Sequence, residues 1–132
     1  GQRSESLIPS ILNNLKKCQL PNIRTPINAN DFVYVDDVAD AFSKAVSANF
    51  PSGIYNLGSG RSTTVLDVCR ISEQILWGAE SLTEQVESKK ESSRGEVDFW
   101  ADIKHSKEIL DWQPTISLKD GIQLTQQWIN SQ

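Results

Sequence analysis

Two short apolar runs, each followed by a helix-like pattern, constrain the fold of this chain more than any other feature. The first run, DFVYV at 31–35, precedes apolar residues spaced three and four apart as far as residue 47. The second run, GIYNLG at 53–58, precedes a similar pattern that ends before Gly78. β-branched and aromatic residues favour strands, whereas apolar residues three and four apart favour a helix. A strand followed by a helix, twice in succession, predicts an α/β fold with parallel strands.

Three further helices and one further strand are predicted from the remaining patterns. Apolar residues after Ser6 lie on one helix face, and Asp102 and Ser117 begin two more helical patterns. The run TEQVESK at 83–89 is a candidate strand. We therefore expect about five helices and three short, mainly parallel strands in one domain that spans residues 1–132.

A sheet of only three strands would leave its apolar second strand poorly covered. The run at 53–58 contains no charged residue, which is typical of a strand that is covered on both faces. An apolar strand at an open sheet edge would invite pairing with other chains. The sequence therefore predicts that part of the sheet lies outside this chain.

Adjacent aspartates at 36 and 37 raise the question of a catalytic or metal-binding pair. Adjacent residues do not share a helix face, so the two carboxylates are poorly placed to act on one bond. Carboxylates at a helix start accept hydrogen bonds from free N–H groups and interact with the positive end of the helix dipole. We interpret Asp36 and Asp37 as helix-capping residues, with a metal or catalytic role as the alternative.

The segment Gly58-Ser59-Gly60 lies between a predicted strand and a predicted helix, where a phosphate-binding turn would lie. The complete G-x-G-x-x-G pattern is absent because residue 63 is threonine. We expect a turn that needs the conformational freedom of glycine, with phosphate binding as the alternative.

Composition argues against several classes of function. The net charge is −4 and no basic block is longer than two residues, so nucleic-acid binding is not expected. No signal peptide and no apolar run of membrane-spanning length is recognised, so a cytoplasmic location is expected. Cys18 and Cys69 are expected to be buried and reduced, and the single histidine, His105, cannot complete a metal site with them.

Residues of two loops make up the remaining candidate site. Arg94, Phe99 and Trp100 come late in the chain, whereas Ile23 and Arg24 come early. An arginine matches phosphate oxygens, and a flat apolar side chain can cover a base. Ordinary surface loops are the alternative interpretation.

Four segments occur in an order that resembles one family: DFVYVDDVADAF, GIYNLGSGRSTTVLDV, FWADIKHSKEILDWQP and LKDGIQLTQQW. They are similar to the C-terminal part of extended short-chain dehydrogenase/reductase proteins, the NAD-dependent nucleotide-sugar epimerases and dehydratases that include UDP-glucose 4-epimerase. The resemblance covers nearly the whole chain. It implies the C-terminal portion of an NAD(P)-binding Rossmann fold.

The resemblance also implies which functional parts this chain lacks. The N-terminal Rossmann half of the family holds a glycine-rich loop for NAD or NADP and a Tyr-x-x-x-Lys pair that exchanges a proton with the sugar. Tyr34 is followed four residues later by Val38, and Tyr55 by Ser59, so neither belongs to such a pair. We expect no catalytic residue, metal or cofactor in this chain alone, and NAD or NADP in the full-length enzyme.

Substrate-binding residues follow from the resemblance by position. Ser6 and Leu7 correspond to an asparagine and a leucine that often contact the nucleotide sugar in the family. Ile23 falls near the segment that contacts the base, and Phe32 follows a position that contacts the nucleotide. Phe99 belongs to the late aromatic pair and completes this part of the expected site.

Two positions depart from the family pattern. The arginine that precedes DF in the family is Asn30 here, which removes a charged contact to the diphosphate. The late arginine of the family corresponds to Ser93, whereas Arg94 directly precedes Gly95. We retain Asn30 and Arg94 as expected substrate-binding residues, with Arg94 reaching the diphosphate through a shifted loop.

The main hypothesis is a nucleotide-sugar-binding portion of an epimerase or dehydratase. Its expected ligand is a nucleotide-diphosphate sugar, and its expected protein partner is a second copy or a complementing Rossmann half. The first alternative is a non-catalytic binding or assembly module derived from the family. The second is a remnant that binds no ligand, which the loss of arginine at position 30 motivates.

Overall fold

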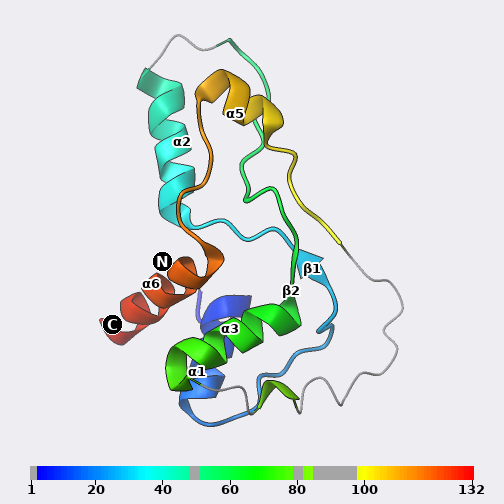
Figure 1. The fold of residues 1–132 in the computed structure, drawn as a ribbon. Coiled ribbons are helices and arrows are strands. Elements are labelled where there is room, and N and C mark those ends of the chain that lie inside the picture. Colours follow the sequence, from blue (N-terminus) through cyan, green and yellow to red (C-terminus); the bar gives the residue numbers. More distant parts are fainter. Residues whose placement is uncertain (1–2, 48–50, 79–81, 85–97) are drawn as a thin grey trace.

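The computed structural model describes residues 3–47, 51–78, 82–84 and 98–132 of the chain. Its elements are, in order, α1 (Leu7–Lys16), β1 (Ala29–Asn30), α2 (Val35–Ser47), β2 (Thr63–Thr64), α3 (Val65–Trp77), α5 (Lys104–Leu110) and α6 (Leu118–Asn130). Helices α1, α3 and α6 pack together at one end, α2 and α5 pack together at the other, and β1 and β2 lie between them (Figure 1). Within these described ranges, no helix is long and apolar enough to cross a bilayer.

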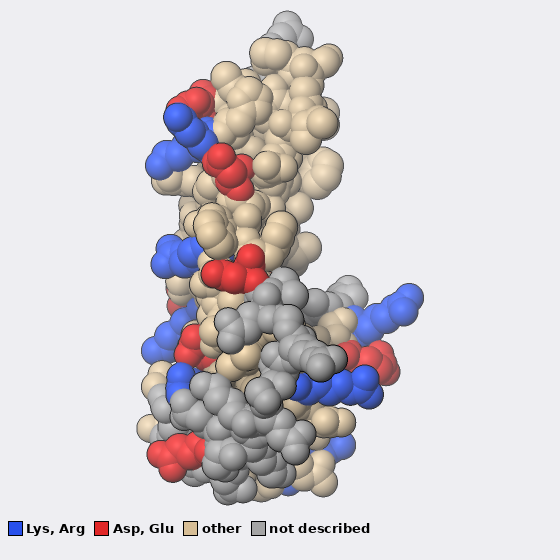
Figure 2. All heavy atoms as spheres, turned by 90° about the vertical axis from the view of Figure 1, so that its right-hand side faces the viewer, with Lys and Arg blue, Asp and Glu red and all other residues tan. Residues whose placement is uncertain are grey.

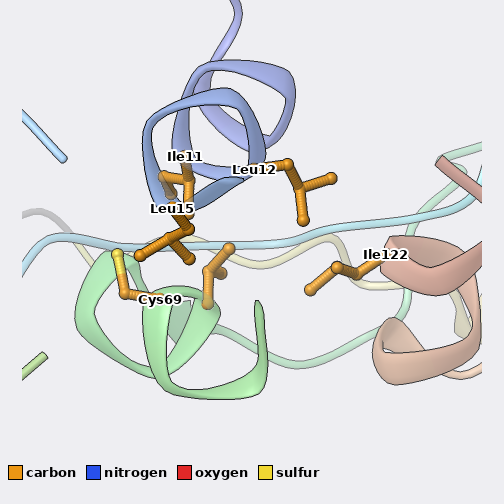
Figure 3. Close-up of a cluster of buried hydrophobic side chains, with 6 residues drawn as sticks. Ile11, Leu12, Leu15, Cys69 and Ile122 are labelled. Atoms are coloured by element: carbon orange, nitrogen blue, oxygen red, sulfur yellow. The ribbon is translucent and has the colours of Figure 1, made fainter. Parts of the chain in front are cut away.

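A buried apolar cluster unites the three helices at the first end. Ile11, Leu12 and Leu15 of α1 point toward Cys69 of α3 and Ile122 of α6 (Figure 3). Their spacing in α1 places them on one helix face, as the sequence predicts. Burying each large aliphatic side chain contributes about 1.5–3 kcal/mol, so this cluster is the main source of hydrophobic stabilisation.

A second cluster joins α2 and α5 around a tryptophan. Trp112 is completely buried and packs with Ala41 of α2 and Leu110 of α5. Its indole N–H donates a hydrogen bond of 2.8 Å to the carbonyl oxygen of Asp37. The polar atom of a buried tryptophan is thereby satisfied, and the helix start is attached to the segment after α5.

Local sequence signals predict the helix ends well. Thr64 accepts a hydrogen bond from the N–H of Asp67 at the start of α3, and Ser117 accepts one from Asp120 at the start of α6. Gly78 ends α3 with a left-handed φ of 71°, as predicted from its position. The predictions for Ser117 and Gly78 are confirmed, and all three helix ends depend on residues within one helical turn.

The predicted strands differ from those observed. Residues 53–58 form no strand, and the strand expected at 31–35 is replaced by β1 at Ala29–Asn30, with α2 beginning at Val35. The prediction of mainly parallel pairing is wrong for β1 and β2, which are antiparallel, although a parallel bridge joins Ala29 to Asp98. A strand is defined by its ladder partner, and nothing described in this chain forms a ladder with 53–58.

The third predicted strand, at 83–89, lies mainly outside the described residues. Thr83 and Glu84, which are described, are helical rather than extended. The mixed α/β character and the five helices named above, all within the described residues, agree with the prediction.

The apolar stripe predicted to be buried on α2 is largely exposed. Only Ala41 is buried, whereas the exposed fraction is 64% for Phe42 and 86% for Val46. Figure 2 views the molecule from the side opposite α2, where the end that contains α5 and residues 51–58 carries its charges along one margin and is otherwise uncharged. The exposed fractions show that the described residues leave the apolar face of α2 uncovered.

The prediction for the cysteines is confirmed for one and wrong for the other. Cys69 is buried in the main cluster, but Cys18 is exposed. The N–H groups of Cys18 and Gln19 donate to the carbonyl oxygens of Leu15 and Asn14, which closes α1. Cys18 thus occupies the left-handed position after the helix, with a φ of 53°, instead of a place on its apolar face.

Asp37 is structural, but it does not cap its own helix as predicted. Its carboxylate accepts hydrogen bonds from the N–H and hydroxyl of Thr115, both at 2.9 Å, and from the N–H of Ile116 at 3.1 Å. Asp37 is buried, whereas Asp36 is exposed in the first turn of α2. The two adjacent carboxylates point to different surroundings, which also argues against a catalytic pair.

Glu73 of α3 makes an equivalent interaction. Its buried carboxylate accepts hydrogen bonds from the N–H groups of Leu82 and Thr83 at 2.7 and 3.1 Å, and from the Thr83 hydroxyl. This interaction attaches the segment after α3 to the side of that helix.

Replacing Asp37 by alanine should destabilise the fold far more than replacing Asp36. Asp37→Ala leaves two backbone N–H groups without an acceptor, and we expect the free energy of unfolding to fall by about 2–4 kcal/mol. Asp36→Ala removes only an exposed charge near a helix start, with an expected loss below about 1 kcal/mol. Urea unfolding followed by circular dichroism measures both values, and equal losses would contradict the structural role of Asp37.

Candidate functional site

Three of the expected substrate-binding residues lie against one buried cluster. Leu7, Ile23 and Phe32 are half-buried and pack against the side chains that unite α1, α3 and α6. They come from the first turn of α1, the following loop and the segment after β1. Apolar residues up to 25 positions apart in the sequence thus pack against the same cluster.

Asn30 and Phe99 lie on neighbouring segments. Asn30 is half-buried in β1, and the N–H of Phe99 donates a hydrogen bond of 3.3 Å to the carbonyl oxygen of Ala29. Ala29 also forms the parallel bridge with Asp98. The ring of Phe99 is exposed. Arg94, the last expected residue, lies outside the described residues.

Ser6 precedes α1 without capping it through its side chain. It occupies the N-cap of the helix but makes no side-chain capping hydrogen bond. The third helical residue, Pro9, has no N–H group to donate to it. The hydroxyl of Ser6 is therefore not used by the helix that it begins.

The carboxylate of Asp31 is the most highly coordinated polar group near these residues. One oxygen accepts hydrogen bonds from the N–H of Ser59 at 2.7 Å and from its hydroxyl at 2.5 Å. The other oxygen accepts from the N–H groups of Gly60 and Ala101, each at 3.1 Å. Asp31 thus connects the segment after β1 to the glycine turn and to the segment that follows Phe99.

The glycine turn is occupied by this carboxylate. A Cβ atom at Gly58 would lie 2.5 Å from Asp31 Oδ2 and 2.7 Å from the Ala101 Cβ, so only glycine fits there. Gly60 has a left-handed φ of 74°. These observations confirm the interpretation as a turn that needs glycine. The alternative of phosphate binding is wrong, because the N–H groups of Ser59 and Gly60 already bind an internal anion.

The same observation tests whether this turn fits the pyrophosphate of NAD. It does not, because the cradle is filled and a second anion would be repelled. Residues of this turn therefore have no role in holding a dinucleotide.

The charge state of Asp31 agrees with its surroundings. Burial acts to raise the pKa of Asp31, but hydrogen bonds from the Ser59 hydroxyl and from three backbone N–H groups outweigh this effect and lower the pKa. Asp31 is therefore ionised at neutral pH, as an acceptor of four hydrogen bonds must be.

Neither a metal-holding cluster nor a reactive buried thiol is found among the described residues. No group of three or more His, Cys, Asp or Glu side chains among them could hold a metal ion. Burial, with a smaller effect from the charge of Glu73, raises the pKa of the Cys69 thiol to about 12, so it is not a nucleophile at neutral pH. What remains is an apolar surface, a free hydroxyl at Ser6 and the amide of Asn30.

Sequence reasoning missed Asp31, although a signal for it was present. A glycine turn with consecutive N–H groups needs an anion, and Asp31 begins the run that was predicted as a strand. The search for that anion considered only external phosphate.

Comparison with known proteins gives relatives of one kind. No family model matches the chain. It is 31% identical over 103 residues to a UDP-glucuronate 4-epimerase of Thermodesulfobacterium geofontis, covering 76% of this chain and 30% of that protein. It is 25% identical over 144 residues to a dTDP-D-glucose 4,6-dehydratase of Bos taurus, covering 96% of this chain and 37% of that protein.

Solved structures agree in fold. The Bordetella bronchiseptica enzyme WbmF, in complex with NADH, matches with a TM-score of 0.78 and 19% identity over 96% of this chain and 37% of its own. The UDP-glucose 4-epimerase of Thermotoga maritima, with UDP-glucose, matches with a TM-score of 0.76 and 25% identity over 96% of this chain and 40% of its own.

The chain spans 30% to 40% of the length of these four proteins. The four sequence motifs, the fold and the relatives lead to the same assignment. The chain belongs to the extended short-chain dehydrogenase/reductase family of NAD-dependent nucleotide-sugar epimerases and dehydratases.

Proposed function

We propose that this chain is the nucleotide-sugar-binding portion of an NAD-dependent sugar-nucleotide epimerase or dehydratase. The observation that carries the proposal is the convergence of Leu7, Ile23 and Phe32 on one buried cluster, beside β1 and Phe99. These residues come from three separate parts of the sequence. The resemblance implies a substrate contact at Leu7, one near Ile23 and one directly before Phe32.

The chemistry of these residues suits a nucleotide diphosphate. The half-buried side chains of Leu7, Ile23 and Phe32 offer apolar contact to a base or sugar ring. Ser6 adds a hydroxyl at the N-terminus of α1, where the helix dipole favours negative charge. The first turn of α1 contains no acidic residue that would oppose a phosphate.

The chain's own residues would bind and orient the sugar nucleotide. NAD would accept and return a hydride in the complete enzyme, and it would be bound by residues outside this chain. The relatives include both epimerases and dehydratases, and the type of reaction would depend on catalytic groups that are also outside this chain.

Calorimetric titration of the isolated chain with UDP-, dTDP-, CDP- and GDP-sugars tests the proposal. We expect one nucleotide class to bind at one site, with a dissociation constant of about 1 mM or below. The free sugar at the same concentration serves as the control, because the proposed contacts are mainly to the nucleotide. Absence of heat with all four classes would contradict the proposal and favour a remnant or an assembly role.

Restoring the arginine of the family at position 30 should strengthen binding. Asn30→Arg places a cation in β1, and we expect the dissociation constant to fall roughly three- to tenfold at low salt, with a smaller gain at high salt. Asn30→Gln, which changes size without adding charge, is the matched control. Unchanged affinity in Asn30→Arg would show that position 30 does not face the diphosphate.

A second candidate function, assembly with another chain, is favoured by the exposed face of α2. Val35, Ala39, Phe42 and Val46 are all exposed and follow one another at intervals of four, three and four residues. That spacing places them on a single stripe of the helix. Ile54 of the unpaired 53–58 segment is 88% exposed. A Rossmann half from a separate chain could cover the stripe and pair with this segment.

Light scattering distinguishes this second function from simple ligand binding. If the stripe pairs two copies, the wild type should show a mass above that of the monomer, and Val46→Asp should restore the monomer by placing a charge in the apolar contact. Gln127→Asp, which adds the same charge on α6, should leave the mass unchanged. A wild-type monomer at all concentrations would contradict self-assembly.

A further inference from the structure

We propose that Asp31 is a positioning residue for the ligand site, which it shapes by holding the segment of Asn30 and Phe32 against the segment of Phe99. This inference rests on the proposed function and names a residue through which that site is built. Asp31 does not itself bind the ligand, because both of its carboxylate oxygens are already used.

The first observation is how the four hydrogen bonds are distributed. Asp31 Oδ1 accepts both of its bonds from Ser59, whereas Oδ2 accepts one from Gly60 and one from Ala101. One oxygen therefore fixes the glycine turn, and the other connects that turn to the segment of Phe99. A single side chain determines the relative position of three segments.

The second observation is the location of Asp31 between the ligand-binding residues. It separates Asn30 from Phe32 in the sequence, and its partner Ala101 lies two residues after Phe99. The Phe99 N–H also donates to the carbonyl of Ala29, two residues before Asp31. The two segments are therefore joined on both sides of Asn30, at Ala29 and at Asp31, and Phe32 directly follows the second of these positions.

The third observation is the close packing around the carboxylate. The absent side chain of Gly58 leaves room for both Asp31 and Ala101, since a Cβ there would lie within 2.7 Å of each. A carboxylate packed this tightly cannot move without shifting the segments that it holds. Rigid support of this kind is what allows half-exposed groups to recognise a ligand.

Asp31→Asn is the direct test, because it keeps the shape of the side chain. If its NH₂ group faces Gly60 and Ala101, both of their N–H groups lose an acceptor; if it faces Ser59, the Ser59 N–H loses its acceptor, whereas the hydroxyl can turn and accept from the amide. At least one of the four bonds is therefore lost in either orientation. We expect the affinity for the nucleotide sugar identified by calorimetry to fall about tenfold or more, while circular dichroism shows a folded protein.

Asp37→Asn is the matched control for loss of stability alone. Asp37 also accepts hydrogen bonds from two consecutive N–H groups and a hydroxyl, but it holds residues 115–116, beyond the expected contacts. We expect a comparable decrease in melting temperature with unchanged affinity. If both variants lost affinity equally, or if Asp31→Asn bound as tightly as the wild type, the positioning role would be overturned.

Amide hydrogen exchange gives a readout that does not depend on the ligand. In Asp31→Asn the N–H groups of Phe99 and Ala101 should exchange faster, while those in the middle of α1 keep their wild-type rates. Unchanged exchange at Phe99 and Ala101 would overturn the inference. If the wild type bound no nucleotide sugar, the proposed function and the ligand part of the inference would fail, whereas the exchange result would still decide whether Asp31 holds the segment.

Two further measurements keep the inference testable if Asp31→Asn does not fold. Ser59→Ala removes the hydroxyl hydrogen bond to the carboxylate but keeps the N–H bond, and it should weaken binding about two- to fivefold. The pKa of Asp31 is lower in the folded than in the unfolded protein. The contribution of Asp31 to the free energy of unfolding should therefore be complete above its unfolded pKa of about 3.9, and it should be lost as the pH falls through the lowered value. If Ser59→Ala bound the nucleotide sugar as tightly as the wild type, the positioning role of Asp31 would be contradicted.

Discussion

Carboxylates that accept hydrogen bonds from two consecutive backbone N–H groups hold the described segments together, where each named strand has only two residues. Asp31, Asp37 and Glu73 each bind two adjacent N–H groups and a hydroxyl from the same two residues. Irregular backbone has N–H groups that need acceptors, and a carboxylate removed from water needs donors. The backbone N–H groups supply the donors that the carboxylate needs, and the carboxylate supplies their acceptor. Loops can therefore be fixed to helices although each strand has only two residues.

The same interactions connect stability to the proposed binding site. The apolar cluster of α1, α3 and α6 supports Leu7, Ile23 and Phe32. The Asp31 carboxylate binds Ala101, two residues after Phe99, and the Phe99 N–H binds Ala29. The N–H groups of the glycine turn bind the Asp31 carboxylate, an internal anion, instead of a phosphate. A sequence that resembles a nucleotide-binding turn thus has a structural role, whereas the proposed nucleotide contacts lie on residues with no recognisable motif of their own.

Sequence reasoning succeeded where a structure depends on neighbouring residues and failed where it depends on distant ones. The starts of α3 and α6 follow from Thr64 and Ser117, whose partners are three residues away. The role of Asp37 could not be found this way, because Thr115 lies 78 residues later. The strand expected at 53–58 and the buried stripe expected on α2 both need a covering surface, and the described residues do not supply one. The expected ligand-binding positions come from the family resemblance and not from the local pattern.

The contact between Gly58 and Asp31 makes these two positions epistatic. A methyl group at 58 collides with the carboxylate and with the Ala101 Cβ, so any larger residue there requires a smaller one at 31 together with a shift of the Ala101 segment. A smaller residue at 31, however, leaves the donors of Ser59, Gly60 and Ala101 without an acceptor. Each single step is therefore unfavourable in either order, and a lineage could leave this arrangement only by changing both residues together.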